Sequence, residues 1–494
     1  MELTKLSSMV TVHLTDMTTL PILLTVLSII ALAVYLTHKI RIRALRKQQL
    51  LHFAFKHASS PSTTTTTTSG DLSYDPKENS WTVRGYEDCT KLCRNPAIAA
   101  NFLPSLMDGL DRSNRNEFSL LVEFFSRWPL FQDGEAQEAL HRCMRRFFSV
   151  QRVERLQGMV EEELQVLLDR IVEEESWDVV ECLARPLPLR VIMRVLGFAD
   201  VDEGRLREWA DVVEEWFGGQ GDLLTRFQRC QDALKEYLVH FEATAARIRS
   251  DKAARQKKDG DIGSPPRPSR CVIEDMLDAV EHGSLAVADV APNVFFLLAA
   301  GHETTTSLLA NSFLLLLDPR HTSQLTRLRQ DPGLLETCLN ELLRVSSPIK
   351  EMVRQVQVPP QQGHRIVFKG HELVNGQMVK LLNTCANMDP SVFPDPHVFD
   401  IRRQEARRHI AFGCGSHSCL GQVLGRAQAR TVLQKVLVTR GTPFDHLHLA
   451  MDPEDVERLP LDSINMIKEL HVSTVPGFSF KSSLQSSTCN KKHA

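Results

Sequence analysis

A segment near the middle of the chain is apolar on nearly every face. Residues 291–317 read APNVFFLLAAGHETTTSLLANSFLLLL, and Pro319 follows as a helix stop. A helix of this length could cross a bilayer, but its centre holds His302 and Glu303, and charge is expensive in lipid. A helix that is hydrophobic all round also suits the centre of a large globular fold. We therefore predict a buried central helix, whose polar middle is a candidate site because a buried carboxylate is costly without a purpose.

The rest of the chain predicts a mainly α-helical body with a small β-sheet subdomain. Apolar spacing is helical over residues 105–350, and strand-like pieces cluster at 365–369 and 378–382. A hydrophobic content of 43% is enough for a large core, and a net charge of −3 excludes a strongly basic nucleic-acid binder. The 11 cysteines are scattered and odd in number, which favours reduced thiols in a cytosol-facing body.

The N-terminus predicts a single membrane anchor. Residues 20–36 read LPILLTVLSIIALAVYL without a charge, and a basic cluster follows at once. The positive-inside bias places the body in the cytosol, and we expect anchorage in the endoplasmic reticulum. A cleaved signal peptide is the alternative, but the basic cluster lies on the wrong side and no A-x-A site follows.

The flanking segments complete the predicted domain organisation. Residues 1–19 form a lumenal N-terminus, 37–71 a basic stop and Ser/Thr-rich linker, 72–484 the catalytic domain and 485–494 a flexible tail.

A glycine-rich loop ends in a cysteine that precedes a helical pattern. Residues 412–421 read FGCGSHSCLG, and the apolar segment that follows Cys419 looks like a helix. A thiolate at a helix N-terminus is favoured by the dipole, so the pKa of Cys419 should fall. Such a thiolate is a metal or haem-iron ligand, or a nucleophile. A buried structural cysteine, or a zinc site with Cys414, is the alternative, although zinc lacks a second Cys/His pair at suitable spacing.

Several further motifs stand in order with this loop. They are AGHETT at 300–305, Glu341-x-x-Arg344, FPDPHVFDIRR at 393–403, ARPLPLRVIMRVLG at 184–197 and His141-x-x-x-Arg145. Together with the loop they make residues 80–480 resemble the cytochrome P-450 family of haem-thiolate monooxygenases. The versions present resemble the bacterial-type branch, whereas an N-terminal anchor is typical of microsomal members. The resemblance implies the cytochrome P-450 fold, haem b (iron protoporphyrin IX) and an oxygen-inserting oxidoreductase.

The resemblance also implies roles for single residues. Cys419 would be the axial ligand of the haem iron, Phe412 would pack beside it, and Gly413 would let backbone N–H groups approach the sulfur. The partners of the haem propionates would be His141, Arg145, Arg354 and His417.

Two more groups follow from the same resemblance. Glu341 and Arg344 would form a buried structural ion network with Arg402. On the central helix, Gly301 would let O2 or substrate approach the backbone, while Glu303 and Thr304 would relay protons.

Electrons must come from a partner, because the sequence has no flavin or nicotinamide motif. We expect an NADPH-dependent cytochrome reductase or another electron donor, O2, membrane lipid and a hydrophobic small-molecule substrate, possibly in secondary metabolism. Phe295, Phe296 and Ile349 are candidates for the substrate pocket. Alternative functions are a P-450-fold isomerase, dehydratase or peroxide-driven enzyme and, in another class, a haem-free membrane scaffold.

Overall fold

The computed structural model describes residues 71–108, 112–198, 200–218, 223–258, 271–359, 361 and 363–475. All of them belong to one compact unit of the chain, Thr63–Ala494. The predicted anchor at 20–36, its flanks at 1–19 and 37–70, and the tail at 485–494 lie outside the described residues.

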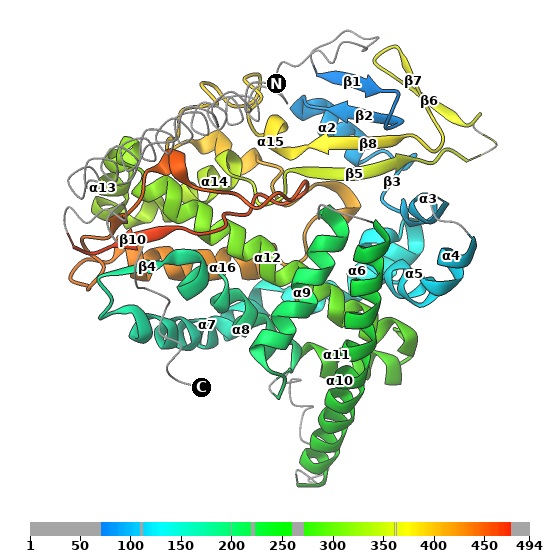
Figure 1. Ribbon diagram of the computed structural model, residues 1–494, viewed down its shortest axis with the longest axis horizontal. Coiled ribbons are helices and arrows are strands. Elements are labelled where there is room, and N and C mark those ends of the chain that lie inside the picture. Colours follow the sequence, from blue (N-terminus) through cyan, green and yellow to red (C-terminus); the bar gives the residue numbers. More distant parts are fainter. Residues whose placement is uncertain are drawn as a thin grey trace, which may run out of the picture. The chain divides into compact units, whose positions relative to one another are not determined.

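Helices make up most of this unit (Figure 1). They are α2 (Tyr86–Cys93), α3 (Leu103–Asp108), α4 (Arg112–Glu117), α5 (Ser119–Ser126), α6 (Gly134–Arg145), α7 (Val150–Ile171), α8 (Pro186–Leu196), α9 (Glu203–Gly218), α10 (Leu223–Lys258), α11 (Val272–Glu281), α12 (Val290–Leu317), α13 (Thr322–Gln330), α14 (Leu335–Val345), α15 (Asn383–Ala386) and α16 (Gln422–Val432). Two π-helical turns accompany them, Val180–Ala184 before α8 and Leu433–Val438 after α16.

Three small sheets account for the strands among the described residues. The largest runs β1 (Leu72–Asp75), β2 (Ser80–Val83), β8 (Met378–Leu382), β5 (Glu351–Val356) and β3 (Ile98–Ala99). The second runs β4 (Ser176–Asp178), β10 (His471–Ser473) and β9 (His448–Leu449), and the third pairs β6 (Arg365–Phe368) with β7 (His371–Val374). The predicted class, mainly helical with small sheets, is confirmed.

The largest sheet lies beside the helices and has its own small core (Figure 1). β2 pairs with β8 in parallel, while β5 pairs with β8 antiparallel with Arg354 opposite Val379. The second half of β5 is buried, and it includes Arg354 at 4% exposed.

α12 is the central helix that its composition predicts. It contacts α8, α9, α11, α13, α14 and α16, and its buried side chains lie on all faces. Pro319 begins a short 3₁₀ turn directly after it, so the predicted stop is confirmed. Within the described part of the chain, no helix combines the length and apolarity that crossing a membrane requires.

Candidate active site

The cysteine loop is a tight backbone structure held by its own hydrogen bonds. Gly413 and Gly415 have φ angles of 70° and 77°, which favour glycine. The Cys419 N–H donates to the Phe412 carbonyl at 2.9 Å, which closes the loop. A Cβ on Gly415 would lie 3.2 Å from the Cys93 carbonyl, so the loop also packs closely against the end of α2.

The Cys419 side chain has accessible surface although protein surrounds it. The residue keeps exposed surface, yet burial raises the pKa of its thiol. The thiol therefore faces a space inside the molecule. Backbone N–H groups of Gly421 and Gln422, at the start of α16, act to lower this pKa, but burial outweighs them. The prediction that the Cys419 pKa falls is thus wrong for this structure, because desolvation is the larger effect.

Cationic side chains lie near this loop without matching carboxylates. Arg354 donates to the Val353 carbonyl at 2.8 Å, and Arg145 donates to His141 Nδ1 at 3.3 Å. His141 in turn donates from Nε2 to the Ser418 carbonyl at 3.3 Å, beside the cysteine. Within the described residues, neither Arg354 nor Arg145 has a carboxylate partner, so this region can accept anionic groups.

His417 has a partner in the protein itself. Its Nε2 lies 3.1 Å from Asp133 Oδ1, and the Asp133 carboxylate also accepts from the N–H groups of Ala100 and Asn101. Burial opposes ionisation of Asp133, but these hydrogen bonds outweigh it and lower its pKa. The structure therefore gives His417 a bond to the start of α6, and a propionate role for it stays a prediction.

One stripe in the middle of α12 keeps accessible atoms. Phe296 and Thr304 are partly buried and Ala300 is exposed, and these three are spaced four residues apart. The Thr304 hydroxyl donates back to the Ala300 carbonyl at 2.9 Å. Next to it, Glu303 is buried at 3% exposed and its Oε1 lies 3.0 Å from His302 Nδ1. The stripe thus faces a space with an apolar wall, one hydroxyl and an adjacent acid.

Gly301 lies where α12 passes closest to α8. A Cβ on this residue would lie 3.1 Å from Ile192 Cδ1 and 3.2 Å from Ile192 Cγ1. The glycine is therefore required for helix packing on this side, and approach of O2 to its backbone stays a prediction.

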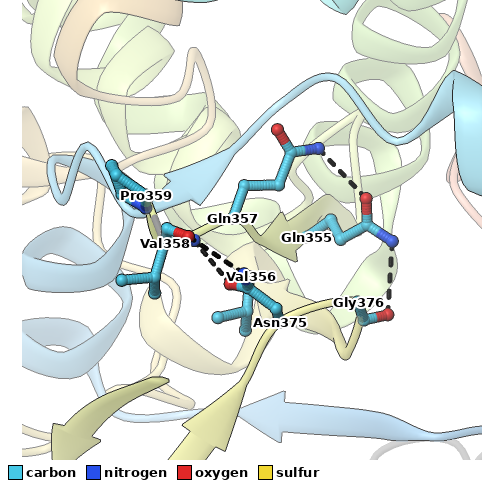
Figure 2. A pocket seen from close by; sticks show the side chains of 7 residues that line it. All are labelled: Gln355, Val356, Gln357, Val358, Pro359, Asn375 and Gly376. Carbon is cyan, nitrogen blue, oxygen red and sulfur yellow. Dashed lines mark hydrogen bonds between the residues drawn. The ribbon is translucent and has the colours of Figure 1, made fainter. Parts of the chain in front are cut away.

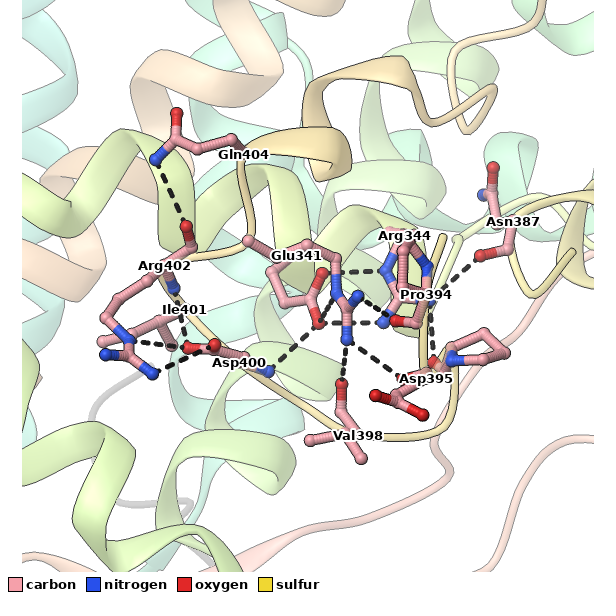
Figure 3. Close-up of polar contacts among 12 residues, drawn as sticks. Glu341, Arg344, Asn387, Pro394, Asp395, Val398, Asp400, Ile401, Arg402 and Gln404 are labelled. Atoms are coloured by element: carbon pink, nitrogen blue, oxygen red, sulfur yellow. Dashed lines mark hydrogen bonds and ion pairs between the residues drawn. The ribbon is translucent and has the colours of Figure 1, made fainter. Parts of the chain in front are cut away.

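A buried ion network surrounds Glu341 (Figure 3). Arg344 donates to both Glu341 oxygens at 2.8 Å, and both side chains are 0% exposed. Arg344 also donates to the carbonyls of Asn387 and Pro396 and lies 5.4 Å from the centre of the Phe393 ring. The i,i+3 pair therefore joins α14 to the chain segment that leads to the cysteine loop.

The third member of the network is Arg403, so the prediction of Arg402 is wrong. Arg403 Nε lies 3.2 Å from Glu341 Oε1, whereas Arg402 pairs with Asp400 and is 56% exposed. The Asp400 N–H donates to Glu341 at 3.1 Å, and the turn after it directs the second arginine back to the carboxylate. Sequence reasoning missed this because the two arginines are adjacent and only the turn separates their directions.

Comparison with known proteins places this geometry in a family. The family model for cytochrome P450 matches residues 113–439. The polyketide biosynthesis cytochrome P450 PksS of Bacillus subtilis is 27% identical over 76% of this chain and 84% of its own length. The cytochrome P450 monooxygenase PikC of Streptomyces venezuelae is 30% identical over 72% of this chain and 77% of its own length.

The chain belongs to the cytochrome P450 family. Among solved structures, P450BioI bound to an acyl carrier protein carrying hexadec-9Z-enoic acid has a TM-score of 0.67 and 27% identity, covering 80% of this chain and 92% of that one. The myxobacterial CYP267B1, in complex with myristic acid, also has a TM-score of 0.67, with 28% identity over 82% and 93%. The predicted class of enzyme, a P450 monooxygenase that uses haem b, is confirmed.

The residues of this P450 fit a haem. The thiol of Cys419 faces an internal space, two backbone N–H groups point at its sulfur, and the buried guanidinium of Arg354 has no anion in the described part of the protein. A haem brings an iron for the thiolate and two propionates for the cations. A sulfur donor beside cations that have no anionic partner among the described residues therefore matches a haem.

The comparisons correct the predicted location. The relatives named above whose source is given are bacterial enzymes, and bacteria have no endoplasmic reticulum. No described helix could serve as an anchor, and residues 20–36 lie outside the described part. The prediction of a single-pass endoplasmic-reticulum protein is therefore wrong.

Two further observations concern pockets. A pocket of about 360 Å³ lies at the end of β5, and none of the predicted site residues borders it. Figure 2 shows Gln355, Gln357 and Asn375 in its lining. Phe295, a candidate for the substrate pocket, is 1% exposed and packs 4.5 Å from the Tyr237 ring, so it belongs to the aromatic core. Phe296 and Ile349 remain partly exposed and stay candidates.

Proposed function

We propose that this P450 inserts one oxygen atom from O2 into a hydrophobic small molecule, with electrons from a separate donor protein. The observation that carries the proposal is the pairing of an accessible thiol at Cys419 with the accessible stripe of α12. The stripe offers Phe296 and Ala300 as apolar surface and Thr304 as the nearest hydroxyl. An apolar wall of this kind favours an apolar substrate.

The haem supplies the site at which O2 is bound and reduced. Cys419 would hold its iron, with the N–H groups of Gly421 and Gln422 stabilising the sulfur's negative charge. Phe412 is partly buried in the same loop and would cover the sulfur from water, and Gly413 lets the loop turn beneath it. His141, Arg145 and Arg354 would bind the propionates, with His417 holding the loop to Asp133.

Protons would reach the oxygen through Glu303 and Thr304. Glu303 is buried against His302. Burial disfavours ionisation of the Glu303 carboxyl, but the neighbouring histidine outweighs burial and lowers the pKa of Glu303. The adjacent Thr304 hydroxyl can donate toward the internal space when it releases the Ala300 carbonyl. An isomerase or dehydratase would need neither group.

The electron donor would approach the face that carries α6 and the segment before the cysteine loop. Arg142, Arg146, Arg407 and Arg408 are exposed there, which suits an acidic protein. We propose an NADPH-dependent reductase system as the source. The role of PksS in polyketide biosynthesis, as its name states it, supports a place in the biosynthesis of secondary metabolites.

The test uses purified protein loaded with haem. Reduction under CO should give the long-wavelength Soret band of a thiolate ligand, and fatty acids or macrolactones should shift the resting spectrum toward high spin. With an NADPH-driven reductase and ferredoxin, a binding compound should gain one oxygen atom that carries label from ¹⁸O2. A rearranged or dehydrated product without label would instead indicate an isomerase or dehydratase, and turnover with peroxide alone would indicate a peroxide-driven enzyme. Protein that takes up no haem would support the haem-free scaffold.

A further inference from the structure

A group of charged side chains is buried where α9 crosses α12. His302 and Glu303 of α12 have side chains that are 0% and 4% exposed and lie 3.0 Å apart. His302 Nε2 has no hydrogen-bond partner within the described residues, and no described donor of good geometry reaches either oxygen of Glu303. Buried polar groups normally have hydrogen-bond partners. The partners of this pair must therefore come from another segment than α12.

Two carboxyl groups of α9 face this pair. Asp211 and Glu214 are spaced i,i+3 and therefore share a face of their helix. Burial, and then the charge of Glu303, raise the pKa of Glu214 to about 9 and that of Asp211 to about 6. Glu214 Oε1 is buried and also lacks a donor among the described residues.

The approach of these acids favours a proton on one of them, because two ionised carboxylates repel each other. Burial, and then the charge of Glu303, raise the pKa of Glu214, which makes Glu214 the protonated member near neutral pH. Its carboxyl O–H can donate, whereas Glu303, with its pKa lowered by His302, is the ionised member that can accept.

The outer end of the group reaches the surface. Arg207 Nε lies 3.8 Å from Asp211 Oδ2, and Arg207 also pairs with Glu181 at 3.2 Å. Glu181 pairs with Arg185 at 2.6 Å, where the chain enters α8. The side chains of Arg207, Asp211 and Glu181 are 38%, 42% and 44% exposed. Titratable side chains of α9 therefore lie between solvent and the buried Glu303.

We propose that Asp211 and Glu214 are positioning residues that supply protons to Glu303 from the surface between α8 and α9. The inference rests on the proposed monooxygenase function and adds its proton source. The Thr304 hydroxyl gives up its proton toward the reaction as it accepts one from the Glu303 carboxyl. Glu303 then takes a proton from the Glu214 carboxyl, and Glu214 regains one from water through Asp211. Each proton leaving toward the reaction is replaced by one from solvent.

The first experiment needs no turnover. Infrared spectra of the resting holoenzyme near neutral pH should contain the C=O band of a protonated carboxylic acid, with a small shift in D2O. Glu214→Gln should remove this band, whereas Glu208→Gln, an exposed residue of the same helix, should leave it. A band that survives in Glu214→Gln would show that Glu214 does not carry the proton.

The second experiment measures proton supply. Glu214→Gln should slow product formation by about 10-fold or more, since positioned proton transfer is worth about 10²–10⁴-fold. It should also raise the solvent isotope effect and move the pH profile, and Asp211→Asn should do so more weakly. Glu214→Asp should restore part of the rate, because it keeps the carboxyl. The relay is refuted if the wild-type protein turns over substrate and Glu214→Gln has the same isotope effect and pH profile. The monooxygenase function would then still stand.

Failure of the function itself is separate. If wild-type protein shows the infrared band but never adds oxygen to a substrate, the buried proton stands and the proposed function falls, together with the relay that depends on it.

Discussion

Arg403 Nε lies 3.2 Å from Glu341 Oε1, and the arginine side chain is only 8% exposed. It also donates to the carbonyls of Asp395 and Val398, so a single guanidinium ties the segment before the cysteine loop to α14. The neighbouring Arg402 forms its ion pair at the surface. Replacing each of these two adjacent arginines should therefore change the free energy of unfolding by a different amount.

Removing the buried arginine should be costly. Arg403→Ala leaves Glu341 with one partner fewer in a fully buried site, and breaking a buried pair costs about 3–5 kcal/mol. Arg402→Ala should lower the free energy of unfolding by less than about 1 kcal/mol, as exposed pairs do. Urea unfolding of the two variants measures this, with haem retention as a second readout. Equal losses in both would contradict the assignment of Arg403.

The contact between α12 and α8 predicts a steric effect. Gly301→Ala places a methyl group 3.1 Å from Ile192 Cδ1, and overpacking of this size costs about 1–3 kcal/mol. Ile192→Val should recover part of the loss in the double variant. Gly158→Ala on α7, which has open space around it, should instead stabilise by about 0.5–1 kcal/mol. Thermal unfolding of the wild type, the three single variants and the double variant tests this, and additive losses at 301 and 192 would exclude direct contact.

The accessible thiol predicts a spectroscopic loss. Cys419→Ser should abolish the long-wavelength Soret band of the reduced CO complex, because an alcohol oxygen replaces the thiolate donor. Cys143→Ser, on α6 and partly buried, should retain the band. Loss of the band in both variants would point to a folding defect, and its retention in Cys419→Ser would overturn the ligand assignment.

The buried acids predict how stability depends on pH. Glu214 has a native pKa of about 9, above the ordinary value of 4.5, so the native state binds more protons than the unfolded state between these values. Stability should therefore fall as pH rises through this window, and the loss should be complete above the native pKa. Glu214→Gln should flatten the decline, as measured by urea unfolding at pH 5, 7 and 8. A decline as steep in the variant as in the wild type would show that Glu214 is not protonated.

Features carried by neighbouring residues could be predicted from the sequence. The central helix follows from an uninterrupted apolar run with polar residues at its middle, and α12 forms as expected. Glu341 and Arg344 are brought together by helix geometry alone, since an i,i+3 spacing puts them on one face. The turn of the cysteine loop follows from glycines that accept positive φ.

The tertiary structure decided what depends on distant segments. Which of two adjacent arginines reaches Glu341 depends on a turn after Asp400, and the place of Phe295 depends on Tyr237 of α10. The ionisation of Cys419 depends on how deeply the fold surrounds it, which outweighs the helix N-terminus.

The acids near Glu303 also separate what the sequence determines from what the tertiary structure decides. The sequence alone determined that a carboxyl and a hydroxyl stand side by side on a buried helix, because both belong to one turn. Only the packing of α9 across α12 brought Asp211 and Glu214 to that carboxyl, since burial and charge act through space between segments far apart along the chain.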